Sequence, residues 1–241
     1  MQPTLVGVDH FDEHNYGIEG CIKQFLAFKK KFGLEIIVSD GGSKDNTVKI
    51  AKRFADKVVV WKKKVRQNIP QGRNAGCFAA KGNLLFVTDA DCRVKDLEKF
   101  FSKVIAEFGD EKLVALTGNV LINPKEKKFV DSIHHFFNFY NHITNLLHIG
   151  GARGEFQVVR ASAFKKVGGY DEKLTSSEDF DLFYRLRNFG KVKFVYSLVV
   201  FESARRYRKL GYPRVLVTWL FEGLYNIFTG KAPFKEWKVV R

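Results

Sequence analysis

The sequence predicts an α/β fold with a mostly parallel, Rossmann-like central sheet that is flanked by helices. Short apolar runs alternate with segments of helical periodicity through the first half of the chain, and this alternation is typical of parallel strands joined by right-handed crossovers. Two of the apolar runs end in aspartate. The length of 241 residues and the hydrophobic share of 45% are sufficient for a buried core.

Residue patterns define each element in turn. The run at 4–8 is apolar and β-branched, which is typical of a strand, whereas 18–31 places apolar residues at helical spacing. The other elements of the first half are strands at 35–40, 58–61 and 84–87 and helices at 45–54 and 73–81. The second half is less regular, with strands at 113–120, 156–160 and 194–201 and helices at 129–149, 178–188 and 215–228. We expect a catalytic domain over 1–205 and a basic, aromatic helical extension over 206–241.

The chain is strongly basic, with 41 lysines and arginines against 26 acidic residues and a formal net charge of +15. Such a charge attracts nucleic acid, anionic lipid or phosphorylated substrates. No zinc-finger spacing or RNA-recognition pattern accompanies it, so we expect no nucleic-acid partner. The sequence shows no signal peptide and no bilayer-spanning apolar run, and its three cysteines are scattered. We therefore expect a cytoplasmic protein, with a peripheral membrane contact left open.

The most informative stretch is Leu84-Leu85-Phe86-Val87-Thr88-Asp89-Ala90-Asp91. Four apolar residues indicate a buried strand, and two carboxylates follow at its carboxyl end, where α/β proteins bind ligands. Two hard oxygen donors suit Mg²⁺ or Mn²⁺, which in turn would hold a diphosphate. The alternative is a strand followed by an ordinary acidic turn.

Three further polar positions have a functional and a structural interpretation. Asp40 ends the second strand and precedes Gly41-Gly42, so its carboxylate suits a base or a ribose hydroxyl. Arg73 is either a cation that faces a diphosphate or a surface arginine at a helix start. Asp179 follows Ser176-Ser177 at another helix start, where it is either a general base for a hydroxyl nucleophile or part of an acidic first turn capped by serine.

Four motifs occur in one order along the chain. They are Glu35-Ile36-Ile37-Val38-Ser39-Asp40-Gly41-Gly42-Ser43, Gly72-Arg73-Asn74, Thr88-Asp89-Ala90-Asp91, and Val167-Gly168-Gly169-Tyr170-Asp171-Glu172 before Glu178-Asp179. With these motifs the chain resembles the family 2 glycosyltransferases of GT-A fold, over most of its length. The resemblance implies a hexosyltransferase that moves a sugar from a nucleotide-sugar donor, a UDP- or GDP-sugar first of all, to an acceptor with inversion and with Mg²⁺ or Mn²⁺.

The resemblance also implies the donor-side residues. Asp40 would bind the nucleobase or ribose, and Arg73 would add positive charge near the diphosphate. Asp89, Ala90 and Asp91 would hold the ribose and the metal-bound diphosphate, with Asp91 as the more direct metal ligand.

On the acceptor side, the resemblance makes Asp179 the catalytic base, while Glu178 would orient it or meet the acceptor. The chain departs from the family after the first strand, where Asp12 and Glu13 stand in the nucleotide-contacting places. It departs again at Glu202, where many relatives carry histidine, so a third protein ligand to the metal is not expected there. Arg206 lies just beyond and would close over the diphosphate.

The sequence allows more than one interpretation of the acceptor and of the carboxyl-terminal helix. The aromatic helix at 215–228 either packs on the domain or contacts an anionic membrane. The acceptor is correspondingly a soluble glycan or a polyprenyl-phosphate lipid. Two other functions compete with sugar transfer. One is a sugar-phosphate nucleotidyltransferase, for which the expected glycine-rich loop and lysine near the amino terminus are missing. The other is a basic nucleic-acid or phosphate-binding protein without catalysis.

Overall fold

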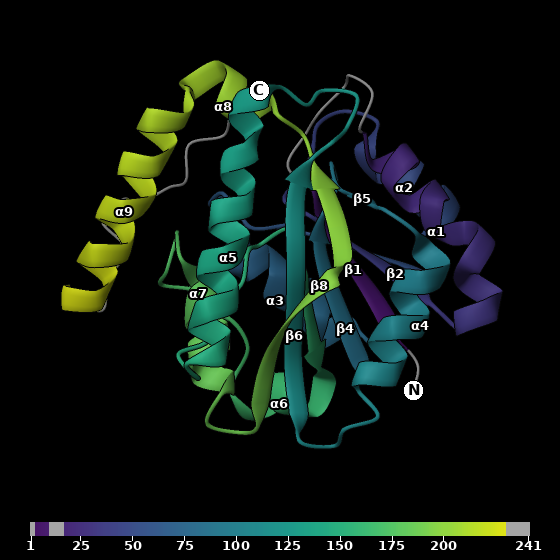
Figure 1. The fold of residues 1–241 in the computed structure, drawn as a ribbon. Coiled ribbons are helices and arrows are strands. Elements are labelled where there is room, and N and C mark those ends of the chain that lie inside the picture. The colour runs from purple at the N-terminus through teal and green to yellow at the C-terminus, as the bar shows by residue number, and fades with distance from the viewer. Residues whose placement is uncertain (1–2, 10–16, 230–241) are drawn as a thin grey trace.

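A single eight-stranded sheet forms the centre of the computed structural model, which describes residues 3–9 and 17–229 (Figure 1). Its strand order is β3-β2-β1-β4-β7-β6-β8-β5. The strands of the first half are parallel to one another: β1 (Pro3–Asp9), β2 (Glu35–Asp40), β3 (Lys57–Val60) and β4 (Leu84–Asp89). Parallel pairing brings their carboxyl ends to one edge of the sheet, so the aspartates that end β2 and β4 lie at the same edge.

Helices connect these strands as the sequence predicts. They are α1 (Ile18–Phe32), α2 (Thr47–Phe54) and α3 (Ile69–Ala79). The apolar spacing of α1 places Ile22 and Phe25 on one buried face. The helix ends at Gly33, whose φ of 62° is a conformation that glycine adopts at no steric cost.

Helix α3 begins at Ile69, four residues before the start that the sequence predicted at Arg73. The reason is a capping box, in which the Asn68 side chain accepts a hydrogen bond from the backbone N–H of Gln71 and the Gln71 side chain accepts one from the backbone N–H of Asn68. Pro70 fits the first turn because its missing N–H is not needed there. This earlier start buries Arg73 inside the helix instead of leaving it at an exposed end.

The second half of the sheet is mixed. Its strands are β5 (Arg93–Val94), β6 (Leu113–Ile122), β7 (Gln157–Arg160) and β8 (Lys191–Glu202). Strand β7 is antiparallel to β4 and β6, whereas β8 is parallel to β6. The pairing of β6 with β8 shifts register between Gly118 and Asn119, within a continuous strand. A Cβ on Gly118 would lie 2.6 Å from the carbonyl oxygen of Val195, so glycine is required for β8 to approach.

The remaining helices cover the sheet and form the carboxyl-terminal extension. They are α4 (Leu97–Glu107), α5 (Ile133–Leu146) after a 3₁₀ turn (Phe129–Ser132), α6 (Ala161–Lys166), α7 (Glu178–Leu186), α8 (Arg205–Leu210) and α9 (Tyr212–Thr229). Helix α5 packs on β6 and β8, and α9 descends beside it (Figure 1). Among the described residues, none of the helices combines the length and the apolar character that crossing a bilayer requires.

Phenylalanine rings fill the core between α1, α4 and the sheet. Phe25, Phe86 and Phe101 are each at most 1% exposed, and their ring centroids lie 6.2–6.3 Å apart in edge-to-face arrangements. Burying such a side chain contributes about 2 kcal/mol, before any gain from ring geometry. This core holds β1 and β4, and thereby the edge that carries the acidic motifs, in a fixed position.

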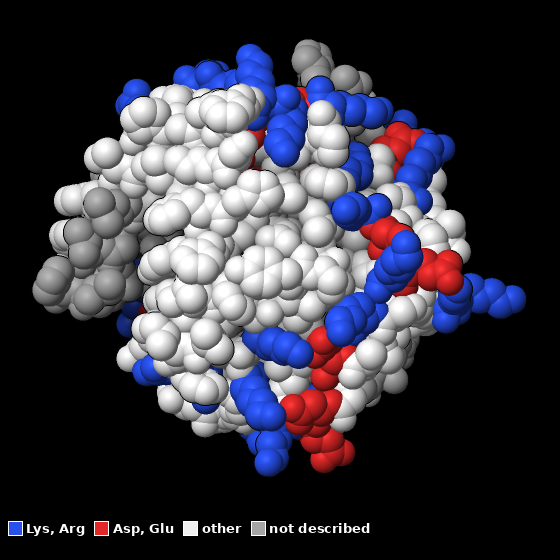
Figure 2. Space-filling view, in the orientation of Figure 1, with Lys and Arg blue, Asp and Glu red and all other residues white. Residues whose placement is uncertain are grey.

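One broad face has almost no charged side chains. Figure 2 shows this face over α5 and the sheet behind it, with lysines and arginines gathered above and below. Helix α5 contains no lysine, arginine, aspartate or glutamate, and it exposes Phe136, Phe139 and Tyr140. An uncharged aromatic face of this kind is unusual in a chain with a net charge of +15.

A buried carboxylate attaches the carboxyl-terminal helices to the domain. Asp131 is 3% exposed and accepts hydrogen bonds from both terminal nitrogens of Arg208, at 2.8 and 2.5 Å, and from the hydroxyl of Tyr212 at 2.5 Å. The hydroxyl of Tyr212 also meets Nε2 of the fully buried His134 at 2.9 Å. Burial alone would raise the pKa of Asp131, but the bonds from Arg208 and Tyr212 hold it well below its usual range.

Replacing Asp131 should therefore loosen α8 and α9 at neutral pH. We expect Asp131→Asn to lower the free energy of unfolding by about 3 kcal/mol at pH 7, because Arg208 loses its charged partner. A carboxylate with a depressed pKa contributes its full stabilisation above the unfolded pKa of about 3.9, and this contribution decreases as the pH falls from there towards the folded pKa. Urea denaturation at pH 7 and pH 3 measures the difference between wild type and variant, which should shrink in acid.

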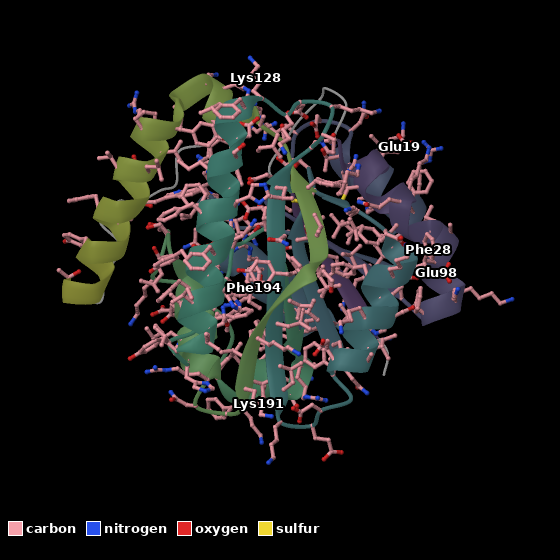
Figure 3. The ribbon with its side chains drawn as sticks, in the orientation of Figure 1. Glu19, Phe28, Glu98, Lys128, Lys191 and Phe194 are labelled. Atoms are coloured by element: carbon pink, nitrogen blue, oxygen red, sulfur yellow. The ribbon has the colours of Figure 1, made fainter. Side chains whose placement is uncertain are left out.

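Glu98→Gln is the matched control. Glu98 makes an exposed ion pair with Lys31 on the far side of the molecule from α8 (Figure 3), so its replacement should cost less than about 1 kcal/mol. A penalty for Asp131→Asn that is the same at both pH values would contradict the assignment.

Candidate functional site

A cleft of about 950 Å³ opens at the carboxyl end of β4. Its walls come from the start of α3, the turn after β4, the segment 152–155, the start of α7, and helices α5, α8 and α9. Of the ten site residues predicted from sequence, the seven that line this cleft are Arg73, Asp89, Ala90, Asp91, Glu178, Asp179 and Arg206. Residues far apart in the chain therefore meet at the sheet edge that the sequence motifs indicate.

Arg73 joins two of the cleft's carboxylates. It is 2% exposed; its Nη1 donates to Oε1 of Glu178 at 2.6 Å, and its Nη2 lies 3.3 Å from Oδ1 of Asp89. A Cβ on Gly154 would collide with the guanidinium, so a glycine is needed beside it. Burial by itself would lower the pKa of Arg73. The negative charges of Asp89 and Glu178 outweigh that effect and raise the pKa above its ordinary value. Arg73 therefore remains a permanent cation in the wall of the cleft.

Asp91, in the turn after β4, is an acid with a raised pKa. Burial, the neighbouring Asp89 and the nearby Glu155 raise the pKa of Asp91 to about 7, against the opposing charge of Arg205. The Arg205 guanidinium lies 3.5 Å from Oδ2 of Asp91. Such crowding of carboxylates stores repulsion that a bound cation would relieve.

The donor set of Asp89 and Asp91 fits a divalent metal that is shared with a ligand. Among the described residues, no group of three histidine, cysteine or acidic side chains is placed to hold a metal ion. Mg²⁺ in proteins is commonly held by one or two carboxylates, with water and substrate phosphates completing its coordination. Asp91, whose pKa is raised, and the neighbouring carboxylate of Asp89 fit that kind of site.

The loop before α7 is held in place from α3. The Asn74 side chain donates to the carbonyl oxygen of Tyr170 at 2.9 Å and accepts from the backbone N–H of Tyr170 at 2.8 Å. Gly169 has a φ of 76°, and a Cβ there would press on the Asn74 side chain. This two-bond contact fixes the loop that leads to Glu178.

The start of α7 differs from the predicted serine cap. Ser177 occupies the N-cap position of α7, but it has a φ of 61° and its side chain makes no capping hydrogen bond, so the expected side-chain cap does not form. The first turn is instead held by the Arg73–Glu178 pair, and Oδ1 of Asp179 accepts from the backbone N–H of Phe180 at 2.8 Å. Burial raises the pKa of Glu178 to about 7, although Arg73 opposes it, and burial likewise raises the pKa of Asp179.

A second buried arginine was not predicted from the sequence. Arg153 donates through Nη2 to Oε1 of Glu202 at 2.5 Å and lies 3.3 Å from Glu155 through its Nε. Burial raises the pKa of Glu202 well above its ordinary value, whereas Arg153 outweighs burial at Glu155 and lowers its pKa. Glu202, at the place where the family resemblance suggests histidine, is thus a partner of Arg153. Only its departure from the family pattern signalled this in the sequence.

The other predicted donor residues lie apart from the cleft lining. Asp40 is fully buried at the end of β2, and its Oδ2 accepts from the backbone N–H groups of Gly42 and Ser43 at 2.9 and 3.0 Å. Its Oδ1 has no hydrogen-bond partner among the described residues. Asp12 and Glu13 fall outside the described residues.

The far part of the cleft is aromatic. Helices α5 and α9 line it with Phe136, Tyr140 and Trp219, and α9 adds a single acid, Glu222. The cleft therefore has a charged end near Asp89 and Asp91 and an apolar end between α5 and α9. A site of this composition can bind a phosphorylated ligand at one end and a less polar one at the other.

Comparison with known proteins gives one family match and one curated relative. The sequence profile described as "Glycosyl transferase family 2" matches residues 10–168. The succinoglycan biosynthesis protein ExoA of Rhizobium meliloti (strain 1021) is 28% identical over 236 residues, which cover 95% of this chain and 69% of ExoA.

Solved structures share the fold. The mannosyltransferase PcManGT from Pyrobaculum calidifontis, in complex with GDP-Man and Mn²⁺, superposes with a TM-score of 0.68 at 17% identity over 95% of this chain. TarS of S. aureus, in complex with UDP-GlcNAc, superposes with a TM-score of 0.57 at 17% identity over 84% of this chain. The chain spans 65% of the length of that mannosyltransferase chain and 58% of the TarS chain, which covers TarS residues 1–349.

Proposed function

The chain belongs to glycosyl transferase family 2, and we propose that it transfers a sugar from a UDP- or GDP-sugar to an acceptor hydroxyl, with inversion and with a divalent metal. The membership confirms the resemblance and the GT-A fold that the order of the sequence motifs predicts. It also displaces both alternatives, the nucleotidyltransferase and the non-catalytic binding protein. The observation that carries the proposal is the meeting of Asp89, Asp91 and Asp179 in one cleft.

The metal, the diphosphate and the nucleoside of the donor each have proposed binding residues. Asp89 and Asp91 would hold Mg²⁺ or Mn²⁺, which when bound stabilises the departing diphosphate. Arg205, 3.5 Å from Asp91, lines the same end of the cleft, and Arg206 next to it in the chain also lines the cleft; their positive charge favours the anionic leaving group. Asp40, whose Oδ1 has no partner among the described residues, would bind the base or ribose.

Asp179 would act as the general base. Its carboxylate takes the proton of the acceptor hydroxyl as the acceptor oxygen forms its bond to the anomeric carbon and the bond to the diphosphate breaks on the opposite face. Glu178, held by Arg73 at 2.6 Å, fixes the first turn of α7 and hence the position of Asp179. The raised pKa of Asp179 suits a base, because proton transfer is most effective when the pKa lies near the working pH.

Asp91 should be required for metal-dependent donor binding. We expect Asp91→Asn to abolish the Mn²⁺-dependent part of UDP or GDP binding, since one of two metal-holding carboxylates is lost. The fold should survive, because the substitution relieves repulsion with Asp89. Calorimetric titration of UDP and GDP with and without Mn²⁺, together with circular dichroism, measures both effects. Unchanged Mn²⁺-dependent binding by a folded variant would rule out the assignment.

Asp40→Asn is the comparison variant in the same titrations. If Asp40 binds the base or ribose, its replacement should weaken nucleotide binding whether or not Mn²⁺ is present. A loss confined to the Mn²⁺ condition would mean that Asp40 serves the metal end instead.

Asp179→Asn should separate turnover from donor binding. The substitution keeps the size of the side chain but removes the proton acceptor, so turnover should fall by about 10²-fold or more with donor affinity nearly unchanged. Release of nucleoside diphosphate from the donor measures turnover. Asp181→Asn is the control, because Asp181 pairs with Arg185 on the same helix and does not line the cleft.

Two results would argue against Asp179 as the base. Equal loss of donor binding and turnover would make it a structural residue. Retained turnover would mean that another residue is the base, with Glu178 as the next candidate.

We further propose that the acceptor is carried on a lipid, polyprenyl phosphate in the first instance, and that the enzyme works at the cytoplasmic face of a membrane. The support is the uncharged face of α5, with exposed Phe136 and Phe139, in a chain of net charge +15. A soluble glycan remains the competing acceptor.

The membrane contact should be measurable by flotation. We expect the protein to float with phosphatidylglycerol-containing vesicles at low salt and the double variant Phe136→Ser, Phe139→Ser to lose this binding. Phe78→Ser is the control, since Phe78 is 50% exposed on α3 and lies away from α5. No flotation at low salt would contradict the membrane contact without touching the sugar-transfer proposal.

A further inference from the structure

Helix α9 places one buried carboxylate in the cleft. Glu222 is the only acidic residue of α9, and it is 2% exposed although it lines the cleft. Its Oε1 is buried and has no hydrogen-bond partner among the described residues. A buried polar atom without a partner is costly, so the presence of this carboxylate in the wall of the cleft calls for a ligand.

The surroundings of Glu222 connect it to the acceptor end of the cleft. Burial raises its pKa to about 7, with Arg206 opposing the shift and Asp179 adding to it. The same wall of α9 presents Trp219, one turn before Glu222, and Tyr140 of α5 also lines this part of the cleft. The carboxylate therefore lies among aromatic rings and within electrostatic reach of Asp179.

We propose that Glu222 binds the acceptor by accepting a hydrogen bond at Oε1 from a hydroxyl of its terminal sugar, beside the ring of Trp219. This assignment rests on the proposed function, because it concerns the substrate that gives its proton to Asp179. Binding sites commonly fix the orientation of a ligand with a few polar groups set among apolar and aromatic side chains. A site built to bond a hydroxyl also rejects analogues that lack it.

Glu222 lies beyond the residues that match the family profile, which end at 168. The donor-side acids Asp89 and Asp91 come from within the matched region, whereas α9 comes from outside it. Because Glu222 would bond the acceptor and not the nucleotide, its loss should weaken acceptor binding and leave nucleotide binding unchanged.

The test uses the full chain with octyl β-D-glucopyranoside and octyl β-D-galactopyranoside as acceptor probes, in the presence of Mn²⁺ and UDP or GDP. Saturation-transfer NMR measures glycoside binding, and calorimetry measures nucleotide binding. We expect Glu222→Ala to weaken the better-bound glycoside by about tenfold or more, because a hydrogen bond to a charged group is lost. Glu222→Gln should be less affected, and nucleotide affinity should stay within about twofold of wild type.

Val217→Ala is the matched control, since Val217 lies on the exposed side of α9 and does not line the cleft. Thermal unfolding gives an independent readout. A ligand-binding carboxylate without a protein partner at Oε1 should leave the melting temperature of Glu222→Gln equal to or above wild type, whereas a structural role predicts a lower one.

The outcomes separate the two proposals. Wild-type binding of neither glycoside, equal glycoside binding by Glu222→Ala and wild type, or a lower melting temperature for Glu222→Gln with unaltered glycoside binding would each overturn the role of Glu222. Absence of nucleotide binding by the wild type would count instead against the proposed function.

Discussion

The buried cation of Arg73 is the interaction on which the cleft depends. Its guanidinium cannot shed its proton, so it is tolerated inside the protein because Asp89 and Glu178 both face it. Glu178 lies 105 residues further along the chain than Arg73. The pair therefore ties the parallel half of the sheet to helix α7, and one side chain joins the end of β4 to the first turn of α7.

Much of the donor end could be predicted from the sequence because its signals are local. The apolar run before Asp89 and Asp91 predicts a strand, and the acids follow it directly, so their place at the sheet edge needs no long-range information. Helix α4 also carried local signals, an Asp96 cap and buried Phe100 and Phe101, which the alternation pattern alone did not identify. Errors at helix starts, as at Asn68 and Ser177, arose where capping chemistry differed from the expected pattern.

The rest of the site could not be predicted because it exists only in the folded chain. Arg153, Glu155 and Glu202 belong to no motif, and they become partners when β8 and the segment before β7 come together. Glu222 reads in the sequence as one acid in an apolar helix. The net charge of +15 likewise gave no indication that this cleft is crowded with carboxylates whose pKa values are raised by burial.

The position of the loop before α7 has an evolutionary consequence. The strands that hold Asp89 and Asp91 precede it, while α7, α8 and α9 follow it. Recombination within this loop would exchange α7, β8, α8 and α9 as a unit and leave β1 to β4 intact. Such a chimaera keeps these contacts only if the incoming segment supplies an acid that pairs with Arg73 and a backbone that can hydrogen-bond to the Asn74 side chain.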